Sequence, residues 1–271
     1  MLFSFYKTIS KLLYGTGISK NKIIRKVHLK LIELTKPKII NVFGYKMILD
    51  KQDEAGHSIT TDDITDEFKK LKKIIKKGDI VVDIGANIGF YTLFFSSLVG
   101  KTGKIIAFEP EPRNFEILKK NIEINYLDNV TLYEKAVGSK NCKIKMKTSN
   151  SIGSHQISIS GNLEIDCIRL DDYITNVNFV KMDAEGYEIE ILKGMPITLH
   201  QNITLMSEFN FKLIKNHSDP IEFFNILSKL NFKFQNMREK FCETNGSEII
   251  MKYQNSLDAT DILCIKKNNY F

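Results

Sequence analysis

Residues 81–93, VVDIGANIGFYTL, constrain the fold more than any other part of the chain. They pass from a β-branched apolar run through Asp83 and two glycines, Gly85 and Gly89, into a second apolar run. This pattern is typical of a strand that turns tightly into a helix, because glycine adopts backbone conformations that other residues avoid. We expect a ligand at this turn, since open α/β sheets bind ligands at the carboxyl ends of their strands.

Strand-like and helical segments alternate after this turn. The expected strands are 80–85, 104–110, 129–138, 178–186, 203–209, 232–236 and 261–267, and the expected helices are 88–100, 111–126, 187–194 and 220–231. This order predicts a mostly parallel sheet with helices on both faces. Three more short strands, 142–149, 155–160 and 163–170, have no helix between them and predict a β insertion. Residues 40–65 are expected to form a hairpin and a loop that lead into the sheet.

The N-terminal residues differ from the rest of the chain in charge. Residues 1–46 carry ten Lys/Arg and one acid, a net +9, whereas the other 225 carry 29 Lys/Arg and 31 acids, a net −2. We therefore expect a basic helical arm, residues 1–40, and one domain, residues 41–271. Apolar residues recur at helical spacing between the lysines of the arm, so it either caps the domain or contacts an anionic membrane surface peripherally. The slightly acidic domain argues against a nucleic acid partner.

Composition favours a cytoplasmic protein. The four cysteines are scattered without a CxxC pair, which fits a reducing compartment. No apolar run is long enough to span a membrane, which takes about 18 residues or more.

A carboxylate follows the glycine turn at an informative spacing. Glu109 stands twenty residues after Gly89, where it can accept hydrogen bonds from both hydroxyls of a ribose. A dinucleotide would favour GxGxxG, whereas here the spacing is GxxxG and Asp83 ends the strand. S-adenosylmethionine carries an ammonium and a sulfonium and no phosphate, so these charges favour it over NAD. Taken one at a time, the glycines could be ordinary turn residues, Glu109 could be a solvated strand end, and Asn87 could cap the helix.

Four segments in order resemble the FkbM family of S-adenosylmethionine-dependent methyltransferases: VVDIGANIGFYTL, IIAFEPEPRNFEILKKNIEIN, YEKAVG and NFVKMDAEGYEIEILKG. The resemblance covers about residues 45–231. The last segment contains Lys181, Asp183, Glu185 and Gly186, and Leu170 and Asp171 precede it. The resemblance implies a class I methyltransferase (Rossmann-like) fold, with seven strands of which the last is antiparallel. It also implies methylation of a hydroxyl, often on a sugar or polyketide-like acceptor.

The resemblance assigns cofactor contacts residue by residue. It implies that the methionine part of S-adenosylmethionine is surrounded by Asp83, Gly85, Ala86, Asn87 and Gly89. It implies that Glu109 and Pro110 hold the ribose, that Ala136 and Val137 line the adenine, and that Asp183 faces the amino group or the acceptor.

Methyl transfer to a hydroxyl needs an oriented acceptor and gains from a nearby base. The candidate catalytic residues are Asp183, Glu185 and Glu208, at or near strand ends. Glu185 could instead be an acid facing a helix dipole. The three carboxylates could together hold magnesium or calcium, but we predict no metal ligand. His57 and His155 lie in polar loops that could cover the cleft, where they could act as a base or contact the acceptor.

The sequence thus predicts a methyltransferase that acts on a hydroxyl of a sugar, glycolipid or secondary metabolite. The expected partner is a small-molecule or glycan acceptor. Two alternatives stay open: a non-catalytic nucleoside-binding module of the same fold, and an NAD or nucleotide-sugar enzyme.

Overall fold

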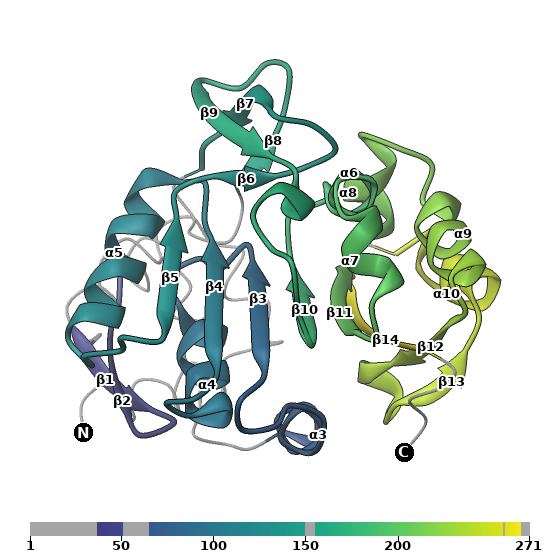
Figure 1. Cartoon of the computed structure of the whole chain (residues 1–271). Coiled ribbons are helices and arrows are strands. Elements are labelled where there is room, and N and C mark those ends of the chain that lie inside the picture. Colours follow the sequence, from purple (N-terminus) through teal and green to yellow (C-terminus); the bar gives the residue numbers. More distant parts are fainter. Residues whose placement is uncertain (1–36, 51–64, 150–154, 257, 267–271) are drawn as a thin grey trace, which may run out of the picture.

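The computed structural model describes residues 37–50, 65–149, 155–256 and 258–266 (Figure 1). These residues form a large central sheet, a hairpin and a small second sheet. Among them, no helix combines the length and apolarity needed to cross a membrane. Most of the predicted arm and His57 lie outside the described residues. Strand β1 (Ile39–Val42) already begins before residue 41, the predicted start of the domain.

The central sheet has the strand order β13-β12-β14-β11-β10-β3-β4-β5. Its parallel strands, from one edge inward, are β5 (Val130–Tyr133), β4 (Lys104–Phe108), β3 (Ile80–Ile84), β10 (Phe179–Met182) and β11 (Thr204–Phe209). Strand β14 (Thr260–Lys266) lies antiparallel between β11 and β12 (Phe232–Asn236). This arrangement confirms the predicted class I methyltransferase fold. A short strand, β13 (Cys242–Thr244), adds an eighth member at the edge.

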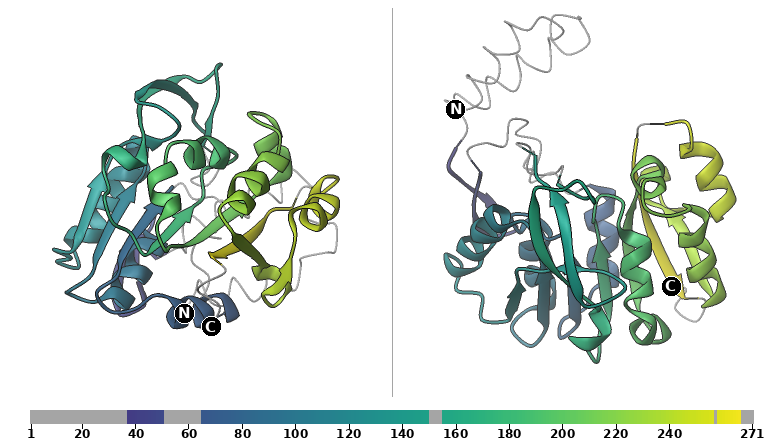
Figure 2. Two further views of the ribbon diagram at one scale, coloured as in Figure 1. Left: turned by 45° about the vertical axis from the view of Figure 1, so that its right-hand side comes forward. Right: turned by 90° about the horizontal axis from the view of Figure 1, so that it is seen from above.

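Helices cover both faces of this sheet, as the alternating pattern predicted (Figure 2). One face packs against α3 (Asp66–Ile74), α4 (Phe90–Val99) and α5 (Pro112–Glu123). The other packs against α6 (Glu188–Lys193), α7 (Pro196–His200), α9 (Ile221–Lys229) and α10 (Gly246–Tyr253). Since both faces are buried, the central strands are continuous apolar runs, and all four residues of β10 are buried.

The expected third strand, 129–138, is wrong as a single strand. The chain leaves the central sheet after β5, and Ala136 and Val137 form β6 (Ala136–Val137) in the second sheet. There β6 pairs in parallel with β9 (Leu163–Ile168), which pairs with β7 (Cys142–Lys147), and β7 pairs with β8 (Gln156–Ile157). This four-stranded sheet is the predicted insertion, and it stands beyond the carboxyl ends of β3, β4 and β5 (Figure 1).

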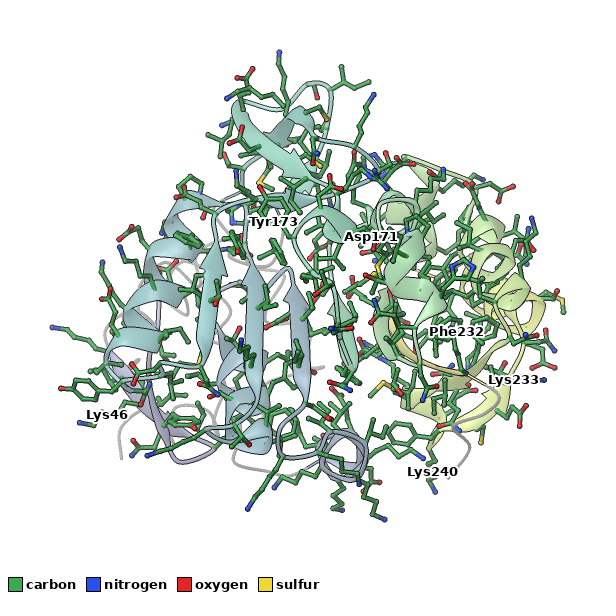
Figure 3. The ribbon with its side chains drawn as sticks, viewed as in Figure 1. Lys46, Asp171, Tyr173, Phe232, Lys233 and Lys240 are labelled. Atoms are coloured by element: carbon green, nitrogen blue, oxygen red, sulfur yellow. The ribbon has the colours of Figure 1, made fainter. Side chains whose placement is uncertain are left out.

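Two contacts fix the chain that returns from the insertion to β10. Asp171, of the predicted family motif, accepts hydrogen bonds from the backbone N–H groups of Ile197 (2.7 Å) and Thr198 (2.9 Å) at the start of α7 (Figure 3). The Tyr173 ring packs edge-on against the ring of Tyr133, with centroids 5.2 Å apart, beneath the insertion (Figure 3). Asp171 therefore has a structural role, because it caps a helix.

The expected hairpin is present and is held to the body by a buried amide. β1 pairs with β2 (Tyr45–Ile48), and the side chain of Asn121 on α5 lies against it, fully buried. Asn121 accepts a hydrogen bond from the N–H of Ile48 (2.6 Å) and donates to the carbonyl oxygens of Ile48 (3.2 Å) and Ile88 (2.7 Å). One turn further, Asn125 bonds both backbone groups of Lys46 in a solvent-exposed setting.

Asn121→Ala should lower the free energy of unfolding by about 1–3 kcal/mol for each buried backbone group left unpaired. Asn125→Ala is the matched control, because water can replace its bonds to Lys46, and it should cost well under half as much. Urea unfolding of both variants measures the difference. Equal losses would mean that burial of the Asn121 amide does not anchor the hairpin.

Candidate active site

The turn between β3 and α4 is shaped by two glycines. Gly85 has φ +74°, and a Cβ atom built on it would lie 1.8 Å from the backbone oxygen of Asp183. Gly89 has φ +98°, and a Cβ there would lie 2.7 Å from the Leu118 side chain. Both positions therefore favour glycine: at Gly85 because the Asp183 backbone leaves no room for a side chain, and at Gly89 because its positive φ strains other residues. Helix α4 begins after Gly89, so the alternative that Asn87 caps it does not hold.

Glu109 anchors the turn from the neighbouring strand. Its carboxylate accepts hydrogen bonds from the N–H groups of Asn87 (2.8 Å) and Glu111 (2.9 Å). Burial raises the pKa of Glu109 to about 7, although the two N–H groups partly oppose that rise. Each carboxylate oxygen has a further lone pair, and Glu109 lines the cleft described next. The residue thus ties two loops together and still offers acceptors to a ligand.

A cleft of about 700 Å³, including space open to solvent, lies at the carboxyl ends of the strands. The predicted residues that line it are Gly85, Asn87, Glu109, Pro110, Ala136, Val137, Asp183 and Glu185. Four other predicted residues are not part of the lining: Asp83, Ala86, Gly89 and Glu208.

Asp83 lies behind the cleft and belongs to a buried charge network. It is fully buried and accepts a hydrogen bond from the Thr92 hydroxyl (2.6 Å). The ammonium of Lys181, its register neighbour on β10, lies 3.6 Å from one Asp83 oxygen and 3.4 Å from Asp183 Oδ2. Burial alone would lower the pKa of Lys181, but Asp183 and Asp83 together raise it well above its usual value. Lys181 is therefore a fixed cation beneath the strand ends, 4.9 Å from the centre of the Tyr91 ring.

Three carboxylates converge where β10 and β11 end. Side-chain oxygens of Asp183, Glu185 and Glu208 lie within 4.8 Å of one another. The backbone turns here rather than continuing as a strand, with Glu185 at φ +51°. Such a conformation is strained for a residue other than glycine and is often found at functional sites. The turn brings the predicted catalytic acids together; the set could also coordinate a divalent ion, and the absence of a metal requirement stays a prediction.

Burial and mutual repulsion raise the pKa values in this acid cluster. Burial is the largest cause for Glu185, whose pKa rises to about 8, and for Glu208, whose pKa rises to about 9, with Asp183 adding to both. Asp261 is the direct cross-strand partner of Glu208, and burial raises its pKa to about 7. Like charges in such positions repel, so these groups hold protons more tightly than free carboxyls do.

The structure brings further residues to the cleft. His155 lines it, as expected for a residue of a loop that covers the cleft, whereas Met146 and Ile157 of the insertion were not expected there. Tyr187, after the turn that carries Asp183 and Glu185, and Lys135, before β6, also line it. Lys181, which belongs to the family motif, shares a strand face with Asp183 because it stands two residues before it. The approach of Met146 and Ile157 depends on how the second sheet stands on the first, which the sequence pattern does not show.

The unliganded protein should lose stability as the pH rises from about 4.5 to about 9. The pKa values of Glu185 and Glu208 are 4.5 in an unfolded chain and about 8 and about 9 in the folded protein. The folded state therefore binds more protons across that window, and stability is highest below it. Melting temperatures between pH 5 and pH 9 measure the slope.

Glu208→Gln should flatten that slope and raise the melting temperature at pH 8, because it removes one carboxylate from the cluster. Glu123→Gln, at an exposed position on α5, should leave the slope unchanged. A melting temperature that rises between pH 6 and pH 9 would contradict the assignment.

The chain is similar in sequence to known methyltransferases. Residues 83–247 match the family model described as the methyltransferase FkbM domain. A hexuronic acid methyltransferase, AglP, from Haloferax volcanii is 26% identical over 213 residues, which cover 75% of this chain and 84% of AglP. Methyltransferase 1 of Beauveria bassiana is 24% identical over 144 residues, covering 42% of this chain and 57% of that protein. A solved structure of methyltransferase FkbM from Methylobacillus flagellatus aligns with 92% of this chain and 60% of its own, at 13% identity and a TM-score of 0.45.

Proposed function

Because the chain belongs to the FkbM family of S-adenosylmethionine-dependent methyltransferases, we propose that its cleft methylates a hydroxyl group of a carbohydrate-containing acceptor. The observation that carries this proposal is the convergence of the Asp183, Glu185 and Glu208 carboxylates at the ends of β10 and β11. Asp183 and Glu185 line the same cleft as Glu109, the carboxylate expected to bind the ribose. The acceptor class extends to glycolipids and to hydroxylated secondary metabolites.

The chemistry of the cleft residues fits S-adenosylmethionine. Glu109 keeps unused acceptor lone pairs that suit the two ribose hydroxyls. Asp183, with its side chain 40% exposed in the cleft, offers a carboxylate to the ammonium group of the cofactor. Ala136 and Val137 are small, apolar and suited to the adenine ring. Gly85, Asn87 and Pro110 line the rest of the proposed cofactor site. The bound cofactor supplies an electrophilic methyl group on a sulfonium.

Asp83, Ala86 and Gly89 support the cofactor site from behind in this proposal. Asp83 acts through Lys181, which donates a hydrogen bond to Asp183 Oδ2 (3.4 Å). That bond fixes the orientation of the Asp183 carboxylate. Ala86 and Gly89 shape the turn whose backbone contacts Phe108 and Leu118.

Glu185 is the proposed base that accepts the hydroxyl proton of the acceptor. A pKa of about 8 suits a base that works near neutral pH, because catalytic groups act best when their pKa lies near the working pH. Glu208, with its pKa raised to about 9, keeps a proton at neutral pH and limits the negative charge around Glu185. Asp183 then has two tasks: to hold the cofactor and to orient the acceptor.

A carbohydrate acceptor is favoured by the similarity to the hexuronic acid methyltransferase AglP, which spans most of both chains. An acceptor hydroxyl on a sugar also suits the polar, carboxylate-lined end of the cleft, where carboxylates can accept its hydrogen bonds.

Calorimetry should show that the protein binds S-adenosylmethionine and S-adenosylhomocysteine and does not bind NAD. Glu109→Ala should weaken the binding of both nucleosides by ~1–3 kcal/mol, the scale of hydrogen bonds to a charged group. Glu116→Ala, at an exposed position on α5, is the control and should bind as the parent protein does. Saturable NAD binding without S-adenosylmethionine binding would refute the cofactor assignment.

Glu185→Gln should reduce turnover about 10²–10⁴-fold, as expected when a general base is removed. Its affinity for S-adenosylhomocysteine should change little, whereas Asp183→Asn should lose both turnover and affinity. Turnover is measured as transfer of label from methyl-labelled S-adenosylmethionine to acceptors in a cell extract, followed by identification of the labelled product.

The same assay separates a base from a metal site. Activity that survives EDTA but is lost in Glu185→Gln supports Glu185 as the base. Activity lost to EDTA and restored by magnesium would instead mean that the three carboxylates hold an ion, which would lower the pKa of the bound hydroxyl. Full activity in Glu185→Gln would show that positioning alone suffices.

A further inference from the structure

The insertion contributes an apolar surface to one part of the cleft. Met146 on β7 and Ile157 on β8 are register partners, and both line the cleft. They belong to the same apolar cluster as Ala136 on β6. The insertion therefore places two large apolar side chains beside the small residue that the proposed function assigns to the adenine ring.

His155 adds a hydrogen-bond donor next to this surface. Its Nδ1 atom accepts a hydrogen bond from the backbone N–H of Ser149 (3.1 Å). Burial lowers the pKa of His155, so its imidazole is neutral at pH 7. With Nδ1 acting as an acceptor, the ring proton is on Nε2, and His155 lines the cleft with an N–H group to offer.

His155 lies at the same part of the cleft as these apolar residues. It immediately precedes β8 (Gln156–Ile157), and Ile157 packs in the apolar cluster that contains Met146 and Ala136. An adenine ring matches this setting, since it is a flat apolar ring with nitrogen acceptors on its edge.

We propose that the insertion forms the outer wall of the adenine pocket, with Met146 and Ile157 against the ring and His155 Nε2–H donating a hydrogen bond to the adenosine. This assignment rests on the proposed S-adenosylmethionine site and extends it to three residues of the second sheet. It gives His155 a role in holding the cofactor rather than as a base or an acceptor contact.

The test compares Ile157→Ala with Ile159→Ala in the full-length protein. Ile157 lines the cleft, whereas Ile159, two residues later, is 97% exposed. Calorimetry gives the dissociation constants for S-adenosylhomocysteine and for 5′-methylthioadenosine, which has the adenosine but lacks the amino-acid part. Ile157→Ala should weaken the binding of both nucleosides about 10-fold, the effect of lost apolar contacts in a pocket. His155→Ala should weaken the binding of both about 3–10-fold, because one hydrogen bond is lost. Ile159→Ala should change neither dissociation constant.

Three outcomes would contradict the assignment of the insertion to the adenine pocket. The first is normal nucleoside binding by Ile157→Ala and His155→Ala with reduced label transfer, which would assign these residues to the acceptor. The second is an equal effect of Ile157→Ala and Ile159→Ala, and the third is weakened binding of S-adenosylhomocysteine alone. Melting temperatures identify an unfolded variant, and His155→Ala decides the matter if Ile157→Ala does not fold. If the parent protein binds neither nucleoside, the proposed function itself fails, which is a different result from any of these three.

Discussion

The ammonium group of Lys181 is the interaction on which the carboxyl ends of the central strands depend. Asp83, Asp183, Glu208 and Asp261 end up on one side of neighbouring strands because the parallel register aligns β3, β10 and β11 and the antiparallel register aligns β14. Buried carboxylates repel one another strongly when nothing compensates them. Lys181 lies within 4 Å of two of them, and burial, followed by repulsion from neighbouring acids, raises the pKa values of Glu208 and Asp261. A permanent cation and carboxyl groups that retain their protons together make this concentration of acids compatible with folding.

The same crowding suits the chemistry of the family. In the proposed site, a cationic cofactor would bring positive charge to a place where carboxylates crowd together. Binding there would relieve an unfavourable arrangement, as is common where function and stability compete. Glu185 has a strained backbone, and Gly85 lies in close contact with the Asp183 carbonyl. Both features bring the loop after β3 and the loop after β10 together at the carboxyl edge of the sheet.

Much of this arrangement could be predicted from the sequence. The period of apolar residues gave the order of strands and helices, and therefore the edge at which Asp183, Glu185 and Glu208 meet. What failed was the boundary at residues 134–136, because an apolar β-branched run looks the same whether it pairs within one sheet or passes to another. The burial of Asp83 behind the cleft was also beyond the sequence, since an acid at a strand end shows its residue type but not its neighbours. The approach of Met146 and Ile157 to the cleft depends on contacts between distant segments, which no local pattern encodes.

The insertion begins and ends at neighbouring points. Ala136 pairs with Cys167, and Val137 pairs with Ile168, so the chain leaves and re-enters the body within two adjacent parallel strands. A segment with closed ends places few demands on the rest of the fold, because its length and sequence can change without moving the strands that flank it. The outer part of this sheet can therefore change in length without moving the turns at Gly85 and Glu185, as long as the residues that face the cleft are kept.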